Sequence, residues 1–249
     1  VKNEDSNYDE KFWDVTQSEI KPHFGFIKST TKKSAFVVNT GMMCNILLDG
    51  LQLEIEPETV KKEAYIANKF DFYGTEGSEI SVLKFATYTT SFNHDQKDLN
   101  YETEEVLKSA VSKGFTNLLE EHQKAWQALW QFGDIKIEGD DAAQQAIRFN
   151  IFHLHQTYTG KDERLNIGPK GFTGEKYGGS TYWDTEAYCL QFYLSTAGEK
   201  VAENLLQYRH NQLDKAIENA TKLGFKNGAA LYPMVTNNGE ECHNEWEIT

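Results

Sequence analysis

The run Ile46-Leu47-Leu48-Asp49-Gly50-Leu51-Gln52-Leu53-Glu54-Ile55-Glu56 predicts a β-hairpin. Asp49-Gly50 tolerates the positive φ angles of a type I′ turn, which joins two antiparallel strands through two residues. After the turn, every second residue is Leu or Ile, so one face of the second strand is expected to be buried. Residues 80–90 are rich in β-branched and aromatic side chains and predict another strand. Together these strands indicate part of a β-sandwich that ends near Asp98.

Beyond residue 100 the spacing of hydrophobic residues changes from two to three or four. Apolar residues recur at this spacing from Leu107 to Trp130, which is typical of an amphipathic helix. Three glutamates within residues 102–105 stand where a helix N-terminus favours negative charge. Trp126 and Trp130 lie one helical turn apart. Packing in the core is the first interpretation of this pair, and contact with a sugar is the alternative.

Two further helices are predicted. One follows Asp140-Asp141, because aspartate is a good helix start, and a short strand at Ile135-Lys136-Ile137 is expected before it. In this helix His153 and His155 are two residues apart and face different sides. They are therefore interpreted as hydrogen-bonded structural histidines and not as a metal-binding pair. Another helix is expected over residues 201–220 from its apolar spacing.

The composition is that of an ordinary globular protein, with 39% hydrophobic and 25% charged residues among 249. The net charge of −13 argues against nucleic acid and anionic membranes as partners, because both are bound through basic surfaces. No stretch approaches the roughly 18 apolar residues of a membrane span. The three cysteines are widely spaced without a Cys-x-x-Cys pair, which predicts reduced thiols, a cytoplasmic location and no structural zinc.

A glycine-rich loop over residues 160–180 leads into Tyr182-Trp183-Asp184-Thr185-Glu186. The loop lacks Gly-Lys-Ser/Thr at a helix start, which excludes a phosphate-binding P-loop. An indole beside a carboxylate suits a sugar site, because the ring packs on a C–H face while the carboxylate accepts hydrogen bonds from hydroxyls. An equally weighted alternative is that Asp184 caps the following helix and Trp183 packs in the core.

Residues 239–247 combine four glutamates with Cys242 and His243. A metal site is the least favoured interpretation, because a second His or Cys at ligand spacing is missing. A carboxylate pair for cleaving glycosidic bonds and a solvated acidic loop both remain open from these residues alone.

Several of these runs together resemble glycoside hydrolase family 65. The matching runs are Arg164-Leu-Asn-Ile-Gly168, Gly171-Phe-Thr-Gly-Glu175, Trp183-Asp184-Thr185-Glu186, Ala229-Ala-Leu-Tyr-Pro233 and Gly239-Glu-Glu-Cys-His-Asn-Glu-Trp-Glu-Ile248. The resemblance implies an α+β multidomain fold. An antiparallel β-sandwich portion is expected at residues 1–98, a helical linker at 99–139, and the first helices of an (α/α)6 catalytic barrel at 140–249.

The resemblance also implies a reaction, phosphorolysis with inversion. Maltose and inorganic phosphate would give β-glucose 1-phosphate and glucose, with no further cofactor and no metal. Trp183 and Asp184 match the family pair that holds the non-reducing glucose. The segment from His243, including Glu245, matches a loop beside the acceptor subsite. The run over residues 242–249 favours maltose over kojibiose or trehalose as substrate, and family membership implies a homodimer.

One departure from the family pattern concerns the general acid, a glutamate in a Gly-Pro-Asp/Asn-Glu-Tyr motif. The only Gly-Pro here, Gly168-Pro169, is followed by Lys170-Gly171. The general acid is therefore expected beyond Thr249, and no residue of this chain is assigned as catalytic. The chain, which begins without methionine, is expected to be a middle segment of a longer enzyme. The alternatives are a trehalase-like hydrolase that uses water, and a non-catalytic carbohydrate-binding module built on residues 1–98.

Overall fold

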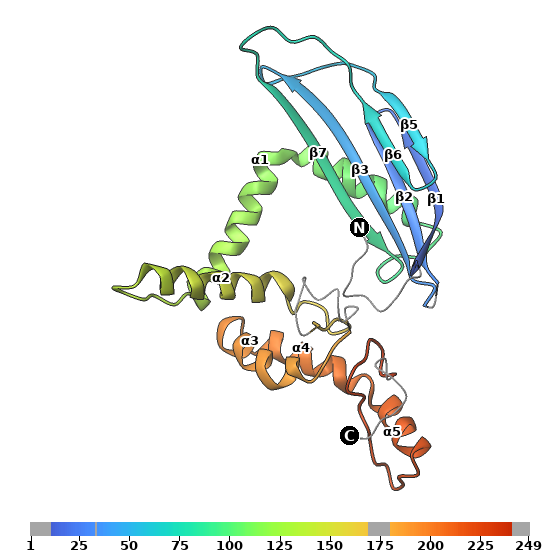
Figure 1. Cartoon of the computed structure of the whole chain (residues 1–249), viewed down its shortest axis with the longest axis vertical. Helices are drawn as coiled ribbons and strands as arrows, with labels where there is room; N and C mark the ends of the chain where they lie inside the picture. The colour runs from blue at the N-terminus through green and yellow to red at the C-terminus, as the bar shows by residue number, and fades with distance from the viewer. Residues whose placement is uncertain (1–10, 33, 169–179, 241–249) are drawn as a thin grey trace. The chain divides into compact units, whose positions relative to one another are not determined.

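A computed structural model describes residues 11–32, 34–168 and 180–240 of the chain (Figure 1). The chain divides into two compact units. One consists of Tyr8–Gln123 and the other of Val1–Asn7 with Lys124–Thr249. We call them the N-terminal unit and the C-terminal unit. Helix α1 (Leu99–Gly133) begins in the N-terminal unit and ends in the C-terminal unit.

The N-terminal unit is built on an antiparallel sheet of five strands (Figure 1). The strands of this sheet are β1 (Trp13–Lys21), β2 (Phe24–Thr31), β3 (Val37–Leu48), β4 (Leu51–Gln52) and β7 (Ile80–Thr90). A separate hairpin consists of β5 (Glu58–Lys62) and β6 (Tyr65–Lys69). Lys61 Nζ in this hairpin donates to Ser18 O in β1 at 2.7 Å. The antiparallel β-region expected at the start of the chain is therefore present.

The hairpin predicted at Asp49-Gly50 is confirmed, with φ angles of 50° and 80° and the pair Leu48↔Leu51 beside the turn. The second strand is much shorter than predicted, because β4 ends at Gln52. Leu53 N still donates to Ile46 O, but the ladder with β3 ends there, although β2 pairs with β3 only as far as Met43. The strand predicted at residues 80–90 is β7, which pairs with β3 along its whole length.

The first half of α1 packs on this sheet. Leu107 is fully buried against Phe24 and Phe26 of β2. Beside them, Thr103 Oγ1 lies 2.9 Å from Asn39 Nδ2 and 2.6 Å from Thr89 Oγ1, so a small buried polar cluster joins α1 to β3 and β7. The N-terminal unit is thus a sheet with a helix fixed on it by apolar packing and by hydrogen bonds.

The long apolar stripe predicted from Leu107 to Trp130 is interrupted. Gly114 has φ 78° and ψ 159°, which breaks the helix, and Phe115 immediately after it is exposed. Trp126 stacks on Trp130 with ring centroids 6.2 Å apart and on Phe152 at 4.8 Å. The two tryptophans thus pack against other aromatic rings but are only half-buried, so their place in a core stays a prediction, whereas burial of the whole stripe was wrong.

The C-terminal unit contains short helices joined by loops. They are α2 (Asp141–Thr157), the π-helical turn η2 (Thr185–Cys189), α3 (Leu190–Thr196), α4 (Glu199–His210) and α5 (Leu213–Lys222). Asp140 caps α2 by accepting a hydrogen bond from Ala143 N at 2.9 Å, as the Asp-Asp start predicted. The helix predicted over residues 201–220 is divided into α4 and α5, because a tight turn with Gln212 N donating to Arg209 O separates them.

Two other local predictions for the C-terminal unit were wrong. Ile135-Lys136-Ile137 is not a strand; instead the side-chain amide of Gln144 donates to Ile135 O and accepts from Ile137 N. This single amide replaces the neighbouring strand that a β-ladder needs. His155 is buried, but its Nε2 atom has no hydrogen-bond partner among the described residues, so it is not the satisfied histidine expected.

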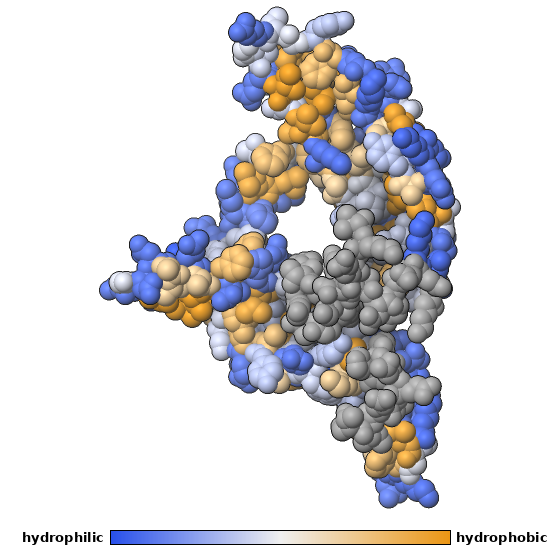
Figure 2. All heavy atoms as spheres, in the orientation of Figure 1, coloured by the Kyte–Doolittle hydropathy of each residue, from blue (hydrophilic) through white to orange (hydrophobic). Residues whose placement is uncertain are grey.

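Aromatic residues occur both in the core and on the surface of the C-terminal unit. Tyr158, Ile167, Tyr193 and Leu205 form its buried cluster. Hydrophobic residues also reach the surface among hydrophilic ones (Figure 2), and exposed Phe149 of α2 is one of them. None of the described helices combines the length and the apolar character that crossing a membrane requires.

Candidate functional site

The site predicted from Trp183 and Asp184 lies at the start of η2. Trp183 is 41% exposed, although its ring is held on two sides. The guanidinium carbon of Arg209 in α4 lies 4.2 Å from the ring centroid, and Tyr232 meets the ring edge-on at 6.1 Å. The ring is therefore fixed in direction while much of its surface stays accessible.

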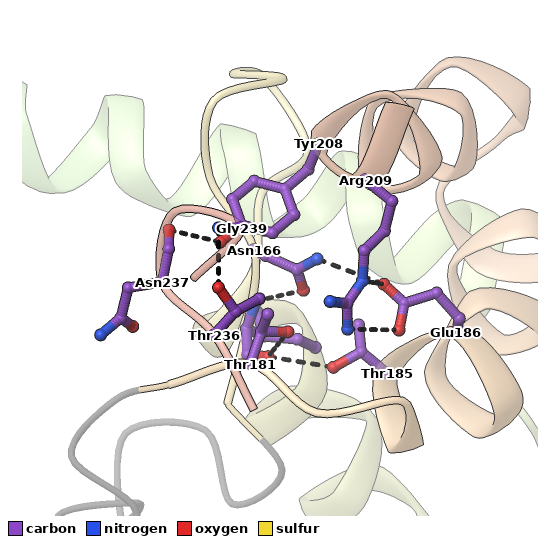
Figure 3. A network of polar contacts seen from close by, with 10 residues as sticks. Asn166, Thr181, Thr185, Glu186, Tyr208, Arg209, Thr236, Asn237 and Gly239 are labelled. Atoms are coloured by element: carbon purple, nitrogen blue, oxygen red, sulfur yellow. Dashed lines mark hydrogen bonds and ion pairs between the residues drawn. The ribbon is translucent and has the colours of Figure 1, made fainter. Parts of the chain in front are cut away.

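Glu186 holds Arg209 through two hydrogen bonds (Figure 3), and this arginine lies over the ring of Trp183. Arg209 Nε donates to Glu186 Oε1 at 2.8 Å and Nη2 donates to Oε2 at 3.2 Å. The two side chains are only 6% and 10% exposed. Asn166 Nδ2 donates to the same carboxylate at 3.4 Å. A bidentate arginine–carboxylate pair fixes orientation as well as distance, so the ring of Trp183 rests on a rigid support.

Asp184 does not act as the cap that was one of the two interpretations of this run. Its φ of −53° and ψ of −35° are helical, and its side chain makes no capping hydrogen bond. A capping residue has extended backbone angles, which Asp184 lacks. Asp184 is exposed, and so is Trp183, which contradicts the core interpretation of the tryptophan. Both non-functional interpretations are therefore wrong, and the role in sugar binding stays a prediction.

The turn that carries Trp183 and Asp184 has unusual backbone hydrogen bonding. Leu190 N donates to Thr185 O, five residues earlier, which defines a π-helical turn. Such turns occur often at functional sites. Burial, aided by the negative charges of Asp184 and Glu186, raises the pKa of the Cys189 thiol, which disfavours its thiolate form.

The two ends of the glycine-rich loop meet beside this turn (Figure 3). Thr181 Oγ1 and Thr185 Oγ1 both donate to Ile167 O, at 3.0 Å and 2.9 Å. Thr181 also pairs with Thr236 through two backbone hydrogen bonds of 2.8 Å and 3.1 Å. Runs that are far apart in the sequence therefore come together around Trp183.

The segment after residue 229 is held by buried side chains of α4 and α5. Tyr208 Oη donates to Asn237 O at 2.6 Å, and Asn219 Nδ2 donates to Gly239 O at 3.1 Å. Thr236 Oγ1 accepts from Gly239 N at 2.7 Å. This fixes the chain just before residues 241–249. His243 and Glu245, the other predicted substrate-binding residues, lie outside the described residues, as do residues 169–179 of the loop.

Arg209 is the residue that the sequence did not reveal. It lies outside every run that resembled the family, and a basic residue near the end of a helix is ordinarily explained by the helix dipole. Within the described ranges no three His, Cys, Asp or Glu side chains gather as a metal ion would require. The site instead presents an aromatic ring and an exposed carboxylate side by side, which suits a polyhydroxylated ligand.

Comparison with known proteins gives the same family for both units. Residues 1–129 match the N-terminal domain of glycosyl hydrolase family 65, and residues 148–249 match its central catalytic domain. Maltose phosphorylase from Bacillus subtilis (strain 168) is 43% identical over 249 residues, which are 100% of this chain and 32% of the relative. Alpha,alpha-trehalose phosphorylase from Thermoanaerobacter brockii is 34% identical over 95% of this chain and 30% of its own length.

A solved structure has the same fold. It is that of a candidate kojibiose phosphorylase from the human microbiome, which matches with a TM-score of 0.77 and 25% identity over 92% of this chain and 29% of the other. The chain spans about a third of the length of the curated relatives it matches. Since the family's N-terminal and central catalytic domains together account for residues 1–129 and 148–249, the chain belongs to glycoside hydrolase family 65.

Proposed function

We propose that this chain supplies the glucose-holding wall of a disaccharide phosphorylase whose substrate is maltose. The observation that carries the proposal is the pairing of an exposed, rigidly supported Trp183 with the exposed carboxylate of Asp184. In the proposed complex the indole packs against the C–H face of the non-reducing glucose. Asp184 accepts hydrogen bonds from two neighbouring hydroxyls of the same ring.

The choice of maltose is supported by similarity along the whole chain. The maltose phosphorylase relative is 43% identical over 249 residues, whereas the trehalose phosphorylase relative is 34% identical over 237. The run Cys242-His-Asn-Glu-Trp-Glu-Ile-Thr249 adds to this support. In the proposal His243 and Glu245 contact the acceptor glucose. The homodimer and the cytoplasmic location expected from the sequence stay predictions.

The proposed chemistry is an inverting displacement. A carboxylic acid protonates the glycosidic oxygen while inorganic phosphate attacks the anomeric carbon from the opposite face, in the position of the water of an inverting hydrolase. Trp183 and Asp184 hold the sugar so that the attack line is set before reaction. The acid is proposed to lie in a part of the catalytic domain outside these 249 residues, since the Gly-Pro-Asp/Asn-Glu-Tyr motif is missing from them. The 249-residue polypeptide alone should therefore release no glucose 1-phosphate from maltose and phosphate.

The test is Asp184→Asn in the full-length enzyme, with phosphate-dependent release of glucose 1-phosphate as the readout. A hydrogen bond to a charged group contributes about 1.5–3 kcal/mol, so losing the charge towards two hydroxyls should reduce turnover by about 10² to 10⁴-fold. Asp214→Asn, an exposed aspartate in the first turn of α5, is the matched control and should retain activity. Near-normal turnover by Asp184→Asn would reject the assignment of the site. Glucose release from wild-type enzyme without phosphate would instead indicate a hydrolase.

A further inference from the structure

The Trp-Asp-Thr-Glu run contains two residues, Thr185 and Glu186, to which the proposed function gives no role. Glu186 follows Trp183 by three residues, which places the two side chains on the same side of a helical turn. We infer that Glu186 and Arg209 are a positioning pair that sets the plane of the Trp183 ring against the bound glucose. This inference rests on the proposed function and extends it to two residues that need not touch the sugar.

The ring of Trp183 is partly exposed, whereas the side chains of Arg209 and Glu186 that support it are buried. Trp183 is 41% exposed, whereas Arg209, which lies 4.2 Å from its ring centroid, is almost completely buried. One face of the indole is thus covered by the guanidinium. The accessible surface of the ring therefore belongs to its opposite face and its edges, and a sugar ring packs on a face of that kind.

The guanidinium of Arg209 uses only two of its three nitrogens in the salt bridge with Glu186. Nε and Nη2 donate to Glu186, but Nη1 is buried without a hydrogen-bond partner among the described residues. Leaving a buried donor unpaired costs free energy. The guanidinium also lies over the indole, and this cation–π attraction offsets part of that cost. Arg209 and Glu186 therefore support the ring of Trp183 in addition to forming a salt bridge with each other.

The surroundings of Trp183 restrict the rotation of its ring. An apolar side chain beneath Trp183 would fill the space without the cost of burying two charges. The fork of two hydrogen bonds from Arg209 to Glu186 instead fixes the tilt of the guanidinium plane. Tyr232 meets the indole edge-on with an interplanar angle of 85°, which limits its sideways movement. Together these contacts leave the ring one orientation, and small displacements of positioning groups reduce rates strongly.

The test is a double-mutant cycle in the full-length enzyme with Arg209→Lys and Trp183→Leu. Lysine keeps the positive charge but cannot form the planar fork. We expect Arg209→Lys to lower kcat/KM for phosphorolysis of maltose about tenfold to a hundredfold while it stays folded. In the Trp183→Leu background the same change should have little further effect, because the ring that it positions is gone. Arg148→Lys, which alters an exposed bidentate pair with Asp134, is the control and should keep full activity.

The outcomes separate the alternatives. Additive losses in the cycle overturn the inference, because a purely structural role of Arg209 is independent of Trp183. If Arg209→Lys does not fold, Glu186→Asp takes its place in the same cycle, and additive losses there overturn the inference equally. A change in the fluorescence of Trp183 in Arg209→Lys, absent in Arg148→Lys, supports it without use of activity. A wild-type enzyme that cleaves no disaccharide rejects the proposed function, whereas an active one with an additive cycle rejects only the positioning role.

Discussion

The sharpest prediction for stability concerns replacement of Glu186 by glutamine. Glutamine keeps the shape and one acceptor but removes the negative charge beside Arg209, whose side chain is 6% exposed. Removing one partner from a buried ion pair leaves an uncompensated charge and costs about 3–5 kcal/mol. Because glutamine can still accept one hydrogen bond, we expect the loss in the free energy of unfolding to lie at about 3 kcal/mol, the lower end of that range. Such a loss is a large fraction of the free energy of unfolding of a typical domain, which is about 5–15 kcal/mol.

The chain contains a matched control in Asp134. It forms the same bidentate pair with Arg148 at 2.9 Å and 2.6 Å, against 2.8 Å and 3.2 Å for the pair of Glu186 with Arg209. Its side chain is 21% exposed and that of Arg148 is 48% exposed, so water solvates both groups when the pair is broken. Asp134→Asn should therefore destabilise the protein much less than Glu186→Gln, although both remove one charge from an arginine fork.

The assay is urea denaturation of the 249-residue chain followed by tryptophan fluorescence. Four of the five tryptophans belong to Lys124–Thr249, so the signal reports mainly on the unit that contains both pairs. A lower midpoint with an unchanged slope measures the change in stability. Equal losses for Glu186→Gln and Asp134→Asn would refute the reasoning, because burial would then not control the cost of breaking these pairs.

Two further predictions concern the sheet and pH. Gly41→Ala should destabilise the N-terminal unit by about 1–3 kcal/mol in urea denaturation followed by circular dichroism, because its Cβ would overlap Thr103 Cγ2 and lie 3.0 Å from Leu107 Cδ1. Gly74→Ala, whose Cβ would lie 3.7 Å from Ile80 Cδ1, should change little, and equal effects would contradict the close packing of α1. Burial lowers the pKa of His155 from its ordinary value of 6.5, so the folded chain binds fewer protons there than the unfolded chain. The stability is therefore complete above pH about 6.5 and falls as the pH drops towards the lower folded-state pKa. Thermal melts at pH 7.5 and 5.5 should differ more for wild type than for His155→Leu; an equal difference would show that another group is responsible.

Local features of the fold followed from local sequence. Asp49-Gly50 allowed a two-residue turn whatever surrounded it, and Asp140 capped α2 through a contact three residues away. Strand β7 was predicted at its observed bounds, because its β-branched and aromatic residues extend along a strand that pairs over its full length. These features depend on interactions within a few residues, or on a pattern that continues through a whole element.

Only part of the site could be predicted from the sequence. Trp183 and Asp184 were found because they are adjacent, but the sequence left a sugar site and a helix cap equally weighted. The helical backbone angles and the exposure of Asp184 exclude the cap. Arg209 was missed because its partner Glu186 is 23 residues away, and nothing in the local pattern links them.

The sequence by itself determined the turns, the caps, the family and the adjacency of the indole and the carboxylate. The tertiary structure decided which group pairs with each strand edge and which group packs on each ring face. β4 ends at Gln52 although its alternating pattern continues to Glu56, and Gln144 takes the place of a strand beside Ile135. It also decided which face of Trp183 is covered. The physical reason is the same in these cases. A hydrogen-bonding edge or a ring face is contacted by the group that lies nearest in space, and the separation of two residues along the chain does not show which group that is.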